Sequence, residues 1–415
     1  MQLEKNTDYK KLLDCALGIA IRLLQNGAEI SRVEETVTHI CMAYGAESVD
    51  VFAIPTKIEA TLETKDEWFT TKMRRIYDQS LNIGRIEDLN RMSRDICNTT
   101  PDVKDIYKMI RDFDKARDPK WMIYLKCFAA FIGCGAFAIM YGGNIVDGLA
   151  SGIVSLIMAI LLFTIGSIGH YKIFNTLVLS IVGGFLSVAF YYMHIGDHIS
   201  YIMIGAVMLL IPGKEFGIAF RELMMRDLIS GAIRIFQSII ITLAIVIGFS
   251  IPIALFNYNM DFYSFHNAII TITMAIIGGV SFSIIFGVKL KRLIYIAVGA
   301  FIVTGVYVLM DHYYDSLLAN IFVAQLAGAL YSELVAKIFK MPTIVCLLTT
   351  NLALVPGGLL YYTIYALWNN QVGAKGYLLD VIYSSFGIGA GILVISIIFN
   401  TIYRTLAYRK MECNK

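Results

Sequence analysis

Two proline–glycine pairs lie inside or at the end of long apolar runs, and they are 144 residues apart: Pro212-Gly213 and Pro356-Gly357. Proline removes a backbone N–H donor and clashes with the preceding helical turn, and glycine lets the chain bend, so each pair predicts a break in a helix. In a membrane, a broken helix is tolerated only where protein or a water-filled cavity satisfies the freed backbone groups. Both pairs are therefore candidates for binding a transported solute. The alternative for each is a simple kink or a helix end at the interface.

Polar side chains within the same kind of apolar run form a second set of candidates. Glu333 lies about two helical turns from Lys340, so its carboxyl group could be buried and carry a proton. The alternative is a helix-end carboxylate paired with Lys337, four residues further on. Lys126 and Arg234 lie close enough to span ends that snorkelling to the interface is the preferred interpretation. Buried amides either contact a solute or hold helices together; the candidates are Asn175, Asn320, Gln325 and Asn351.

Composition indicates the class of protein that contains these residues. The 415 residues are 57% hydrophobic and 16% charged, whereas charged residues make up about a quarter of an ordinary soluble domain. Residues 1–120 hold 19 Lys and Arg and 21 Asp and Glu, which leaves 16 and 11 for the remaining 295 residues. The sequence therefore predicts a soluble N-terminal part followed by a polytopic all-α membrane part.

Within residues 1–120, the hydrophobic pattern predicts helices, then strands, then helices again. Apolar residues recur at helical spacing in residues 9–25 and 29–44, and each of these runs is closed by a glycine. Alternation of apolar and polar residues then predicts strands; they are 48–54, 57–64 and 69–76, and the helices that follow are 85–97 and 102–115. The N-terminus is polar and has no apolar signal core, so we expect a small cytoplasmic α+β domain with a helical stalk.

From Trp121 onward, ten apolar runs are long enough to span about 30 Å of hydrocarbon. They are approximately 121–142, 147–169, 172–193, 198–213, 228–257, 266–287, 292–310, 316–339, 342–368 and 379–403. Lys and Arg mark the cytoplasmic side, and here they fall on alternate loops, whereas the intervening loops hold only Lys375. We therefore expect a multi-pass protein of the cell membrane with both termini in the cytoplasm.

The two Pro-Gly pairs belong to a longer repeat. Residues 133–142 (GCGAFAIMYG) match residues 278–287 (GGVSFSIIFG) at a shift of 145, and the same shift relates Asn175 to Asn320. Each unit holds five spans, an odd number, so the second unit must enter the bilayer from the opposite face. Such a 5+5 inverted repeat with discontinuous helices is typical of secondary transporters. The predicted units are residues 121–257 and 262–412.

Several stretches resemble the threonine/serine exporter family over nearly the whole chain. They are LLQNGAEISRVEETV, AIPTKIEATL, TTKMRRI and GRIEDLNRM in the N-terminal part, and LLIPGKEFGIAFRELMMRDLISGAIRI and LALVPGGLLY in the membrane part. The resemblance implies ten spans, a fused two-half form and export of threonine or serine driven by the proton motive force. Its first membrane motif contains Asp227, which joins Glu333 as a candidate for proton coupling. The family also includes two-chain members associated with dicarboxylate export, so succinate is an alternative substrate.

Two other classes of function are weighed against a secondary transporter. The N-terminal domain offers nucleophile and acid–base side chains, namely Ser31, His39, Cys41 and Glu59, but their spacing matches no catalytic motif. His39 and Cys41 are two apart on a helix and point to different faces, so regulatory or gating packing is expected in place of hydrolysis. A passive channel is the third class.

No cofactor or metal is expected. The seven cysteines are odd in number and have no metal-ligand spacing, which supports neither a disulfide framework nor a zinc site. The expected partners are a small-molecule substrate and membrane lipids, with no nucleic acid. A homo-oligomer is left open.

Overall fold

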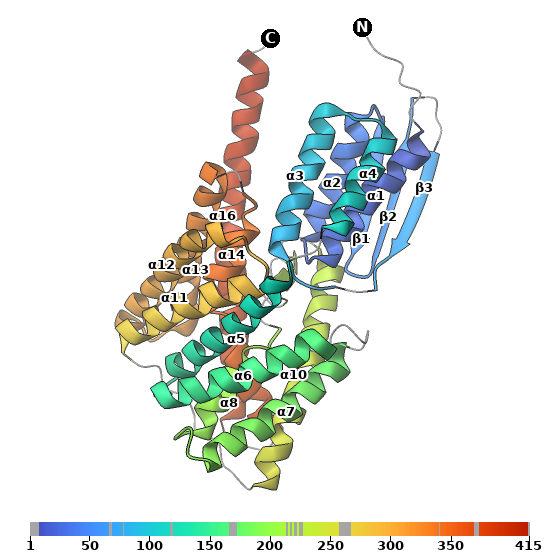
Figure 1. Ribbon diagram of the computed structural model, residues 1–415. Helices are drawn as coiled ribbons and strands as arrows, with labels where there is room; N and C mark the ends of the chain where they lie inside the picture. The colour runs from blue at the N-terminus through green and yellow to red at the C-terminus, as the bar shows by residue number, and fades with distance from the viewer. Residues whose placement is uncertain are drawn as a thin grey trace. The chain divides into compact units, whose positions relative to one another are not determined.

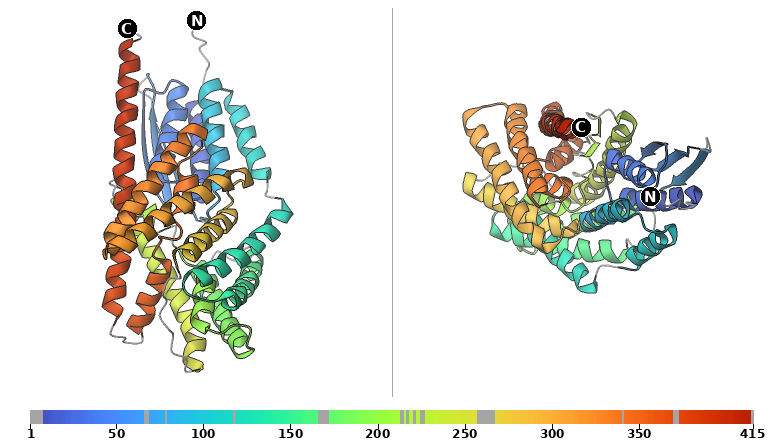
Figure 2. Two further views of the ribbon diagram at one scale, coloured as in Figure 1. Left: turned by 90° about the vertical axis from the view of Figure 1, so that its left-hand side faces the viewer. Right: turned by 90° about the horizontal axis from the view of Figure 1, so that it is seen from above.

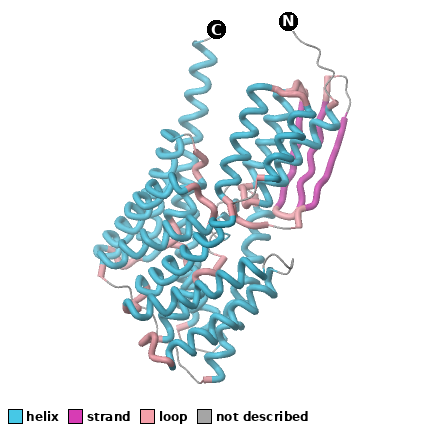
Figure 3. The backbone as a smooth tube through the Cα atoms, viewed as in Figure 1, coloured by secondary structure: helices cyan, strands magenta, loops and turns pink. Residues whose placement is uncertain are grey.

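The computed structural model of the 415-residue chain describes residues 8–65, 69–77, 79–116, 119–165, 172–212, 215, 218–219, 222–223, 227–256, 267–339, 341–368 and 373–413. The chain forms two compact units, Met1–Lys120 and Trp121–Lys415. All described strands lie in the first unit, and the regular structure described in the second is helical (Figure 3).

The described part of the first unit consists of helices packed on one antiparallel sheet. The strands have the order β1-β2-β3, and the helices cover one face of the sheet (Figure 1). Alternate residues of the central strand are buried, because successive side chains of a strand point to opposite faces and only one face meets the helices. The elements are α1 (Tyr9–Gln25), α2 (Ile30–Ala43), β1 (Ser48–Ile54), β2 (Lys57–Glu63), β3 (Phe69–Arg75), α3 (Ile83–Thr99) and α4 (Val103–Lys115).

Helix α1 supplies much of the apolar core of this unit. Its N-terminus is capped by Asp8, whose carboxylate accepts a hydrogen bond from the Lys11 backbone N–H at 3.1 Å. The chain leaves the helix through Gly27, whose φ of 84° is in the left-handed region that glycine favours. On its exposed side, Arg22 pairs with Asp114 of α4, and this guanidinium holds the pKa of the Asp114 carboxyl below its ordinary value.

Eight helices among the described residues are long and apolar enough to cross a membrane. The protein is therefore a polytopic helical membrane protein, as its composition predicts. The last helix continues well past residue 403, where the last predicted span ends, and runs as one piece for 40 residues (Figure 2). The eight are α5 (Lys120–Met140), α6 (Ile145–Ile165), α7 (Lys172–Tyr192), α10 (Leu228–Leu255), α11 (Ala268–Ile285), α12 (Leu293–Tyr313), α13 (Leu317–Phe339) and α16 (Ala374–Cys413).

The other two predicted spans, residues 198–213 and 342–368, are not continuous helices. In the first, α8 (Ile199–Val207) ends five residues before Pro212. In the second, α14 (Ile344–Thr350) and α15 (Gly357–Trp368) are separated by six residues, the last of which is Pro356. Proline directly before a helix is well tolerated, since the first N–H groups of a helix have no partner within it. The total of ten spans stays a prediction.

Small residues allow close approach between helices of the second unit. Gly248 of α10 lies against Ser180 of α7, and a Cβ atom at Gly391 of α16 would lie 2.8 Å from Cβ of Gln325 on α13. In a bilayer, helices associate through van der Waals packing, and glycine brings the backbones close enough for it. The pairs α7–α10 and α13–α16 are accordingly in extensive contact.

Candidate functional site

The two interrupted segments meet in one buried cluster of the second unit. This cluster contains Ile202, Met203 and Ile204 of α8 together with Leu352 and Tyr361 from the second interruption and α15. A helix that stops inside such a cluster leaves backbone groups that the surrounding side chains or a ligand must satisfy. This region of the membrane unit is the candidate functional site.

The first turn of α15 lies against α8 and the end of α5. A Cβ atom at Gly358 would be 3.3 Å from Cδ1 of Ile204 and 3.5 Å from the hydroxyl oxygen of Tyr141. Pro356, which precedes this turn, is buried, and so is Pro212. Free N–H groups at a helix start carry partial positive charge and favour anions such as a carboxylate. Because Pro356 is buried and Gly358 packs against α8 and the end of α5, the start of α15 lies inside the protein.

Of the two predicted glycines, Gly213 lies outside the described residues and Gly357 is the first residue of α15. The sequence motif therefore identifies the start of α15 correctly as the point where the second helix resumes. For the first motif, the described part shows only that α8 has ended before Pro212.

The end of α14 packs into glycine notches on two neighbouring helices. Thr350 lies against Gly299 of α12, and Oδ1 of Asn351 is 2.9 Å from where a Cβ atom of Gly328 on α13 would lie. The Asn351 amide is buried, and its Nδ2 donates to the Leu347 carbonyl at 2.6 Å. This predicted site residue therefore closes its own helix, at the interruption itself.

The predicted amides of α7 and α13 lie in different surroundings. Asn320 is buried and ties α13 to the end of α12, since its Nδ2 donates to Asp311 Oδ1 at 3.2 Å and to the Tyr314 carbonyl at 2.9 Å. Asn175 is only half-buried. Gln325 is fully buried, and neither end of its amide has a hydrogen-bond partner among the described residues. Gln325 is consequently the amide with the greatest remaining capacity to bind a polar ligand.

The two candidates for proton coupling are both partly exposed, one within a helix and one directly before a helix. Glu333 is half-buried on α13, and Lys337 on the next turn is exposed. Asp227 directly precedes α10, and burial raises the pKa of its carboxyl group. Its backbone carbonyl accepts a hydrogen bond from the N–H of Gly231 at 3.0 Å.

Arg234 contradicts the interpretation preferred from the sequence. Its side chain does not snorkel to an interface but is buried, and its Nε donates to Glu222 Oε2 at 2.9 Å. A buried anion supplies the partner that water would otherwise supply, which is why the guanidinium can stay inside. No residue spacing indicates this pair, because Glu222 is 12 residues away and belongs to a different helical segment.

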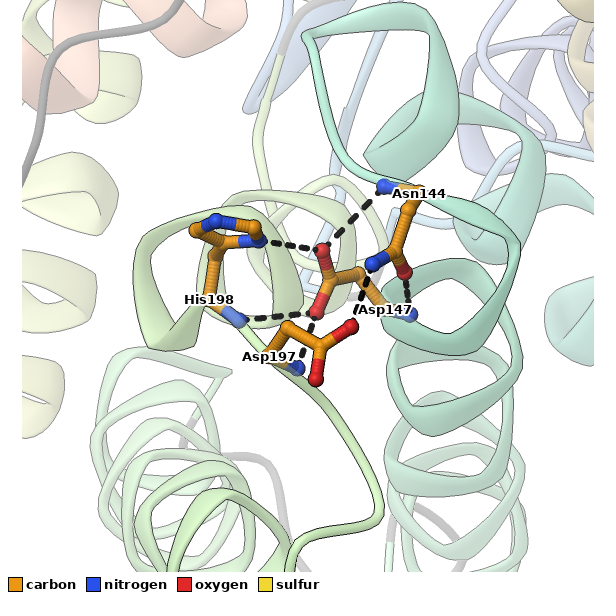
Figure 4. Close-up of polar contacts among 4 residues, drawn as sticks. All are labelled: Asn144, Asp147, Asp197 and His198. Carbon is orange, nitrogen blue, oxygen red and sulfur yellow. Dashed lines mark hydrogen bonds and ion pairs between the residues drawn. The ribbon is translucent and has the colours of Figure 1, made fainter.

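Asp147 is a second buried charge that sequence analysis missed (Figure 4). Its Oδ1 accepts from the backbone N–H groups of Asp197 and His198 at 2.7 and 2.9 Å. Its Oδ2 accepts from Asn144 N–H at 3.1 Å and lies 2.9 Å from His198 Nδ1. The carboxylate therefore fastens the α5–α6 loop to the α7–α8 loop and fixes the start of α8. The only hint in the sequence is that these loops hold Asp and His but neither Lys nor Arg.

The catalytic side chains proposed for the first unit are not brought together. Cys41 is buried, which raises the pKa of its thiol to about 12, whereas His39 on the same helix is exposed. Glu59 pairs with Lys57 at 2.7 Å on the sheet. A protonated thiol without an adjacent base is a poor nucleophile. Among the described residues there is also no group of three or more His, Cys, Asp or Glu that could hold a metal ion.

Long apolar helices, two interrupted segments and charges buried between helices define a multi-pass helical membrane protein. The chain belongs to the threonine/serine exporter family: the family model described as "Putative threonine/serine exporter" matches residues 14–256, and the model "Threonine/Serine exporter, ThrE" matches residues 271–398. Membership of this family indicates an exporter-type membrane transporter rather than an enzyme.

Curated relatives are similar to parts of the chain. "Pheromone-regulated membrane protein 10" of Candida albicans (strain WO-1) is 26% identical over 188 residues, which are 43% of this chain and 17% of that protein. "Probable succinate transporter subunit YjjP" of Klebsiella aerogenes is 26% identical over 144 residues, 35% of this chain and 54% of that protein. An uncharacterized protein of Haemophilus influenzae is 25% identical over 157 residues, 38% of this chain and 52% of that protein.

The matches thus span from about a sixth to about half of these relatives' own lengths. No solved structure matches the chain.

Proposed function

We propose that this protein is a secondary active transporter that exports small hydroxy amino acids, threonine or serine, across the cell membrane and is driven by the proton motive force. The substrate class follows the family description, and alternating access follows the inverted repeat predicted by the sequence. The observation that carries the proposal is a reciprocal contact between α5 and α11.

In this contact, a glycine of each helix packs against a phenylalanine ring of the other helix. A Cβ atom at Gly133 would lie 3.0 Å from the ring of Phe282, and one at Gly278 would lie 2.8 Å from the ring of Phe137. The two rings meet edge to face with centroids 5.5 Å apart. Both glycines and both phenylalanines are related by the shift of 145. A contact in which residue i meets j and the equivalent of j meets the equivalent of i is the signature of a two-fold axis.

Equivalent contacts within each half support the repeat itself. A Cβ atom at Gly183 would lie 2.5 Å from Sδ of Met158 on α6. A Cβ atom at Gly328 would likewise lie 2.5 Å from Cγ2 of Val303 on α12. All of these residues are again related by a shift of 145. One turn along each helix, a buried serine donates its hydroxyl hydrogen bond to the glycine carbonyl, at 2.8 Å in α7 and 2.7 Å in α13.

These contacts favour a 5+5 arrangement in which each interrupted segment is the fourth span of its half. The proposed halves are residues 121–257 and 262–412. Ten spans would put both termini on one side of the membrane, and the Lys and Arg residues of alternate loops favour the cytoplasm for them and for the N-terminal α+β domain of residues 1–120. The solute would bind between the interruptions, with Pro212, Gly213, Pro356 and Gly357 shaping the site. The amides Asn175, Asn320, Gln325 and Asn351 are candidates for contact with it, and Glu333 and Asp227 for proton coupling.

A dicarboxylate such as succinate is the second candidate substrate. The relative from Klebsiella aerogenes, whose printed name is a probable succinate transporter subunit, favours it. Threonine, serine and succinate share a carboxylate, so an anion-favouring helix start suits all three.

A counterflow assay in proteoliposomes tests the proposal. The purified protein is reconstituted with unlabelled threonine inside, and uptake of labelled threonine, serine or succinate is followed with and without an imposed proton gradient. We expect exchange of the hydroxy amino acids and acceleration of net flux by the gradient. Flux that is unchanged when the gradient is collapsed under a fixed solute gradient would identify a passive channel instead.

A further inference from the structure

An ion pair between Arg234 and Glu222 is buried at the start of α10. Nε of Arg234 donates to Oε2 of Glu222 at 2.9 Å, and the side chains are 6% and 4% exposed. Such a pair is not evidence for stability, because removing two charges from water offsets most of their attraction. In a membrane protein, charges turned into the bundle are by default candidates for a substrate pathway.

The pair lies on a buried polar face of α10. Ser230, Arg234, Ser238 and Thr242 follow one another at four-residue spacing, which puts them on one side of the helix, and all are buried. Thr242 donates its hydroxyl hydrogen bond to the Ser238 carbonyl at 2.9 Å. The Ser238 hydroxyl itself has no hydrogen-bond partner among the described residues. One turn from the guanidinium there is therefore a buried hydroxyl with capacity for a further polar contact.

The position of the pair suits a solute that leaves the cytoplasm. Arg234 is six residues beyond the first residue of α10, which corresponds to about 9 Å along the helix axis. The sequence before α10 contains Lys214, Arg221 and Arg226, so α10 is expected to begin on the cytoplasmic side. An exported solute would meet Arg234 early on its way through the membrane.

We propose that Arg234 and Glu222 recognise the charged groups of an α-amino acid: the guanidinium binds the α-carboxylate, and the Glu222 carboxylate binds the α-ammonium. This inference rests on the proposed function and narrows its substrate class. A guanidinium has five N–H donors in a planar fork, and the described bond to Glu222 uses Nε, which leaves the donors of the other two nitrogens as the ones that would bind a carboxylate. The Ser238 hydroxyl is available to the hydroxyl group of threonine or serine.

Charge balance explains why this site would prefer amino acids to dicarboxylates. The pair has no net charge, and neither has a zwitterion, so binding gives each buried ion an additional partner of opposite sign and leaves the net charge of the site unchanged. A dicarboxylate would bring two negative charges into the same site and leave one of them facing Glu222. Like charges in a site of low dielectric constant repel strongly.

The experiment compares ligands that lack one charge with variants that lack its partner. Proteoliposomes containing the full chain are loaded with threonine, and labelled threonine exchange is competed with threoninol, which lacks the carboxylate, with 3-hydroxybutyrate, which lacks the ammonium, and with succinate. The variants are Glu222→Gln, Arg234→Gln and the double variant, which removes both charges and keeps the pair neutral. Lys172→Gln is the matched control, because Lys172 also begins a span and faces a glutamate, Glu215, but is 60% exposed.

We expect wild type and Lys172→Gln to bind threonine at least tenfold more tightly than any of the three competitors. In Glu222→Gln, the affinity for threonine should fall at least tenfold. The affinities for 3-hydroxybutyrate and succinate should rise relative to that for threonine, so the ranking of ligands inverts. The double variant should lose all preference for carboxylates. These rankings are ratios and do not depend on how much protein is folded. An unchanged ranking in Glu222→Gln and in the double variant would overturn the inference and leave a purely structural pair.

A binding measurement separates failure of this inference from failure of the proposed function. The rise in melting temperature of the detergent-solubilised protein is measured with the same ligands, and it requires no transport. If threonine stabilises wild type but not the double variant and no flux occurs, the site stands and the transport function fails. If flux occurs but succinate ranks above threonine in wild type, the transporter stands and the amino-acid site is wrong.

Discussion

Adding a methyl group at Gly278 or at Gly133 tests the reciprocal contact between α5 and α11. A Cβ atom at Gly278 would lie 2.8 Å from the Phe137 ring, and one at Gly133 would lie 3.0 Å from the Phe282 ring. Carbon atoms prefer separations of about 3.5–4.0 Å, so each substitution requires a shift of about 0.5–1 Å. Overpacking of this kind costs about 1–3 kcal/mol.

The helix itself would gain from either change, since alanine is favoured over glycine in a helix by about 1 kcal/mol. Gly305→Ala in α12 measures that gain alone, because nothing lies within 4 Å of a Cβ atom there. We therefore expect Gly305→Ala to raise the melting temperature of the detergent-solubilised protein, and Gly133→Ala and Gly278→Ala to lower it by similar amounts.

Double variants decide whether the contact is reciprocal. Shortening the facing ring should restore stability only in the matched pair, so Phe137→Leu should rescue Gly278→Ala. Phe282→Leu should rescue Gly133→Ala in part, because the added methyl group would also lie 2.9 Å from Cβ of Ser281. The crossed pairs should not be rescued, because the added methyl group then still faces an intact phenylalanine ring. A large loss at one glycine with none at the other, or equal rescue by both leucines, would refute a two-fold contact at this position.

Three other variants or labelling experiments test separate features. Asp147→Ala leaves buried N–H groups of two loops without their acceptor, so it should lower stability by about 2–4 kcal/mol in a thermal unfolding assay; a loss under 1 kcal/mol would mean that water replaces the carboxylate. Pro212→Ala and Pro356→Ala should reduce threonine efflux while membrane insertion persists, and normal efflux in both would make the breaks mere kinks. A cysteine introduced at Asn257 should react with an impermeant reagent in intact cells and one at Asn6 should not; the reverse pattern would invert the topology.

The helices were predictable because their signals are local. Apolar runs and periodic spacing identified the long spans, and the Pro-Gly motif identified the residue at which α15 begins, Gly357. The proline at 212 was less informative, since α8 ends five residues earlier. A proline excludes a continuing helix but does not prevent a helix from ending before it.

The buried charges could not be predicted, because burial depends on which helix faces which. Arg234 and Glu222 are 12 residues apart and come from two helical segments, so no spacing rule pairs them. Asp147 and His198 are 51 residues apart, at the starts of α6 and α8, in stretches that look ordinary by composition. For Arg234 the general tendency of long basic side chains to reach the interface favoured the wrong interpretation, since it takes no account of a counter-ion elsewhere in the chain.

The phenylalanine and glycine contact between α5 and α11 has a consequence for motion in the proposed inverted repeat. If the two halves exchange conformations when the site opens from one side to the other, a contact on the axis between them is the same before and after the exchange. The contact then contributes the same free energy to the inward-open and outward-open forms, so it does not shift the equilibrium between them. Substitutions at Gly133 and Gly278 should change how well the protein holds together without changing which side its site faces.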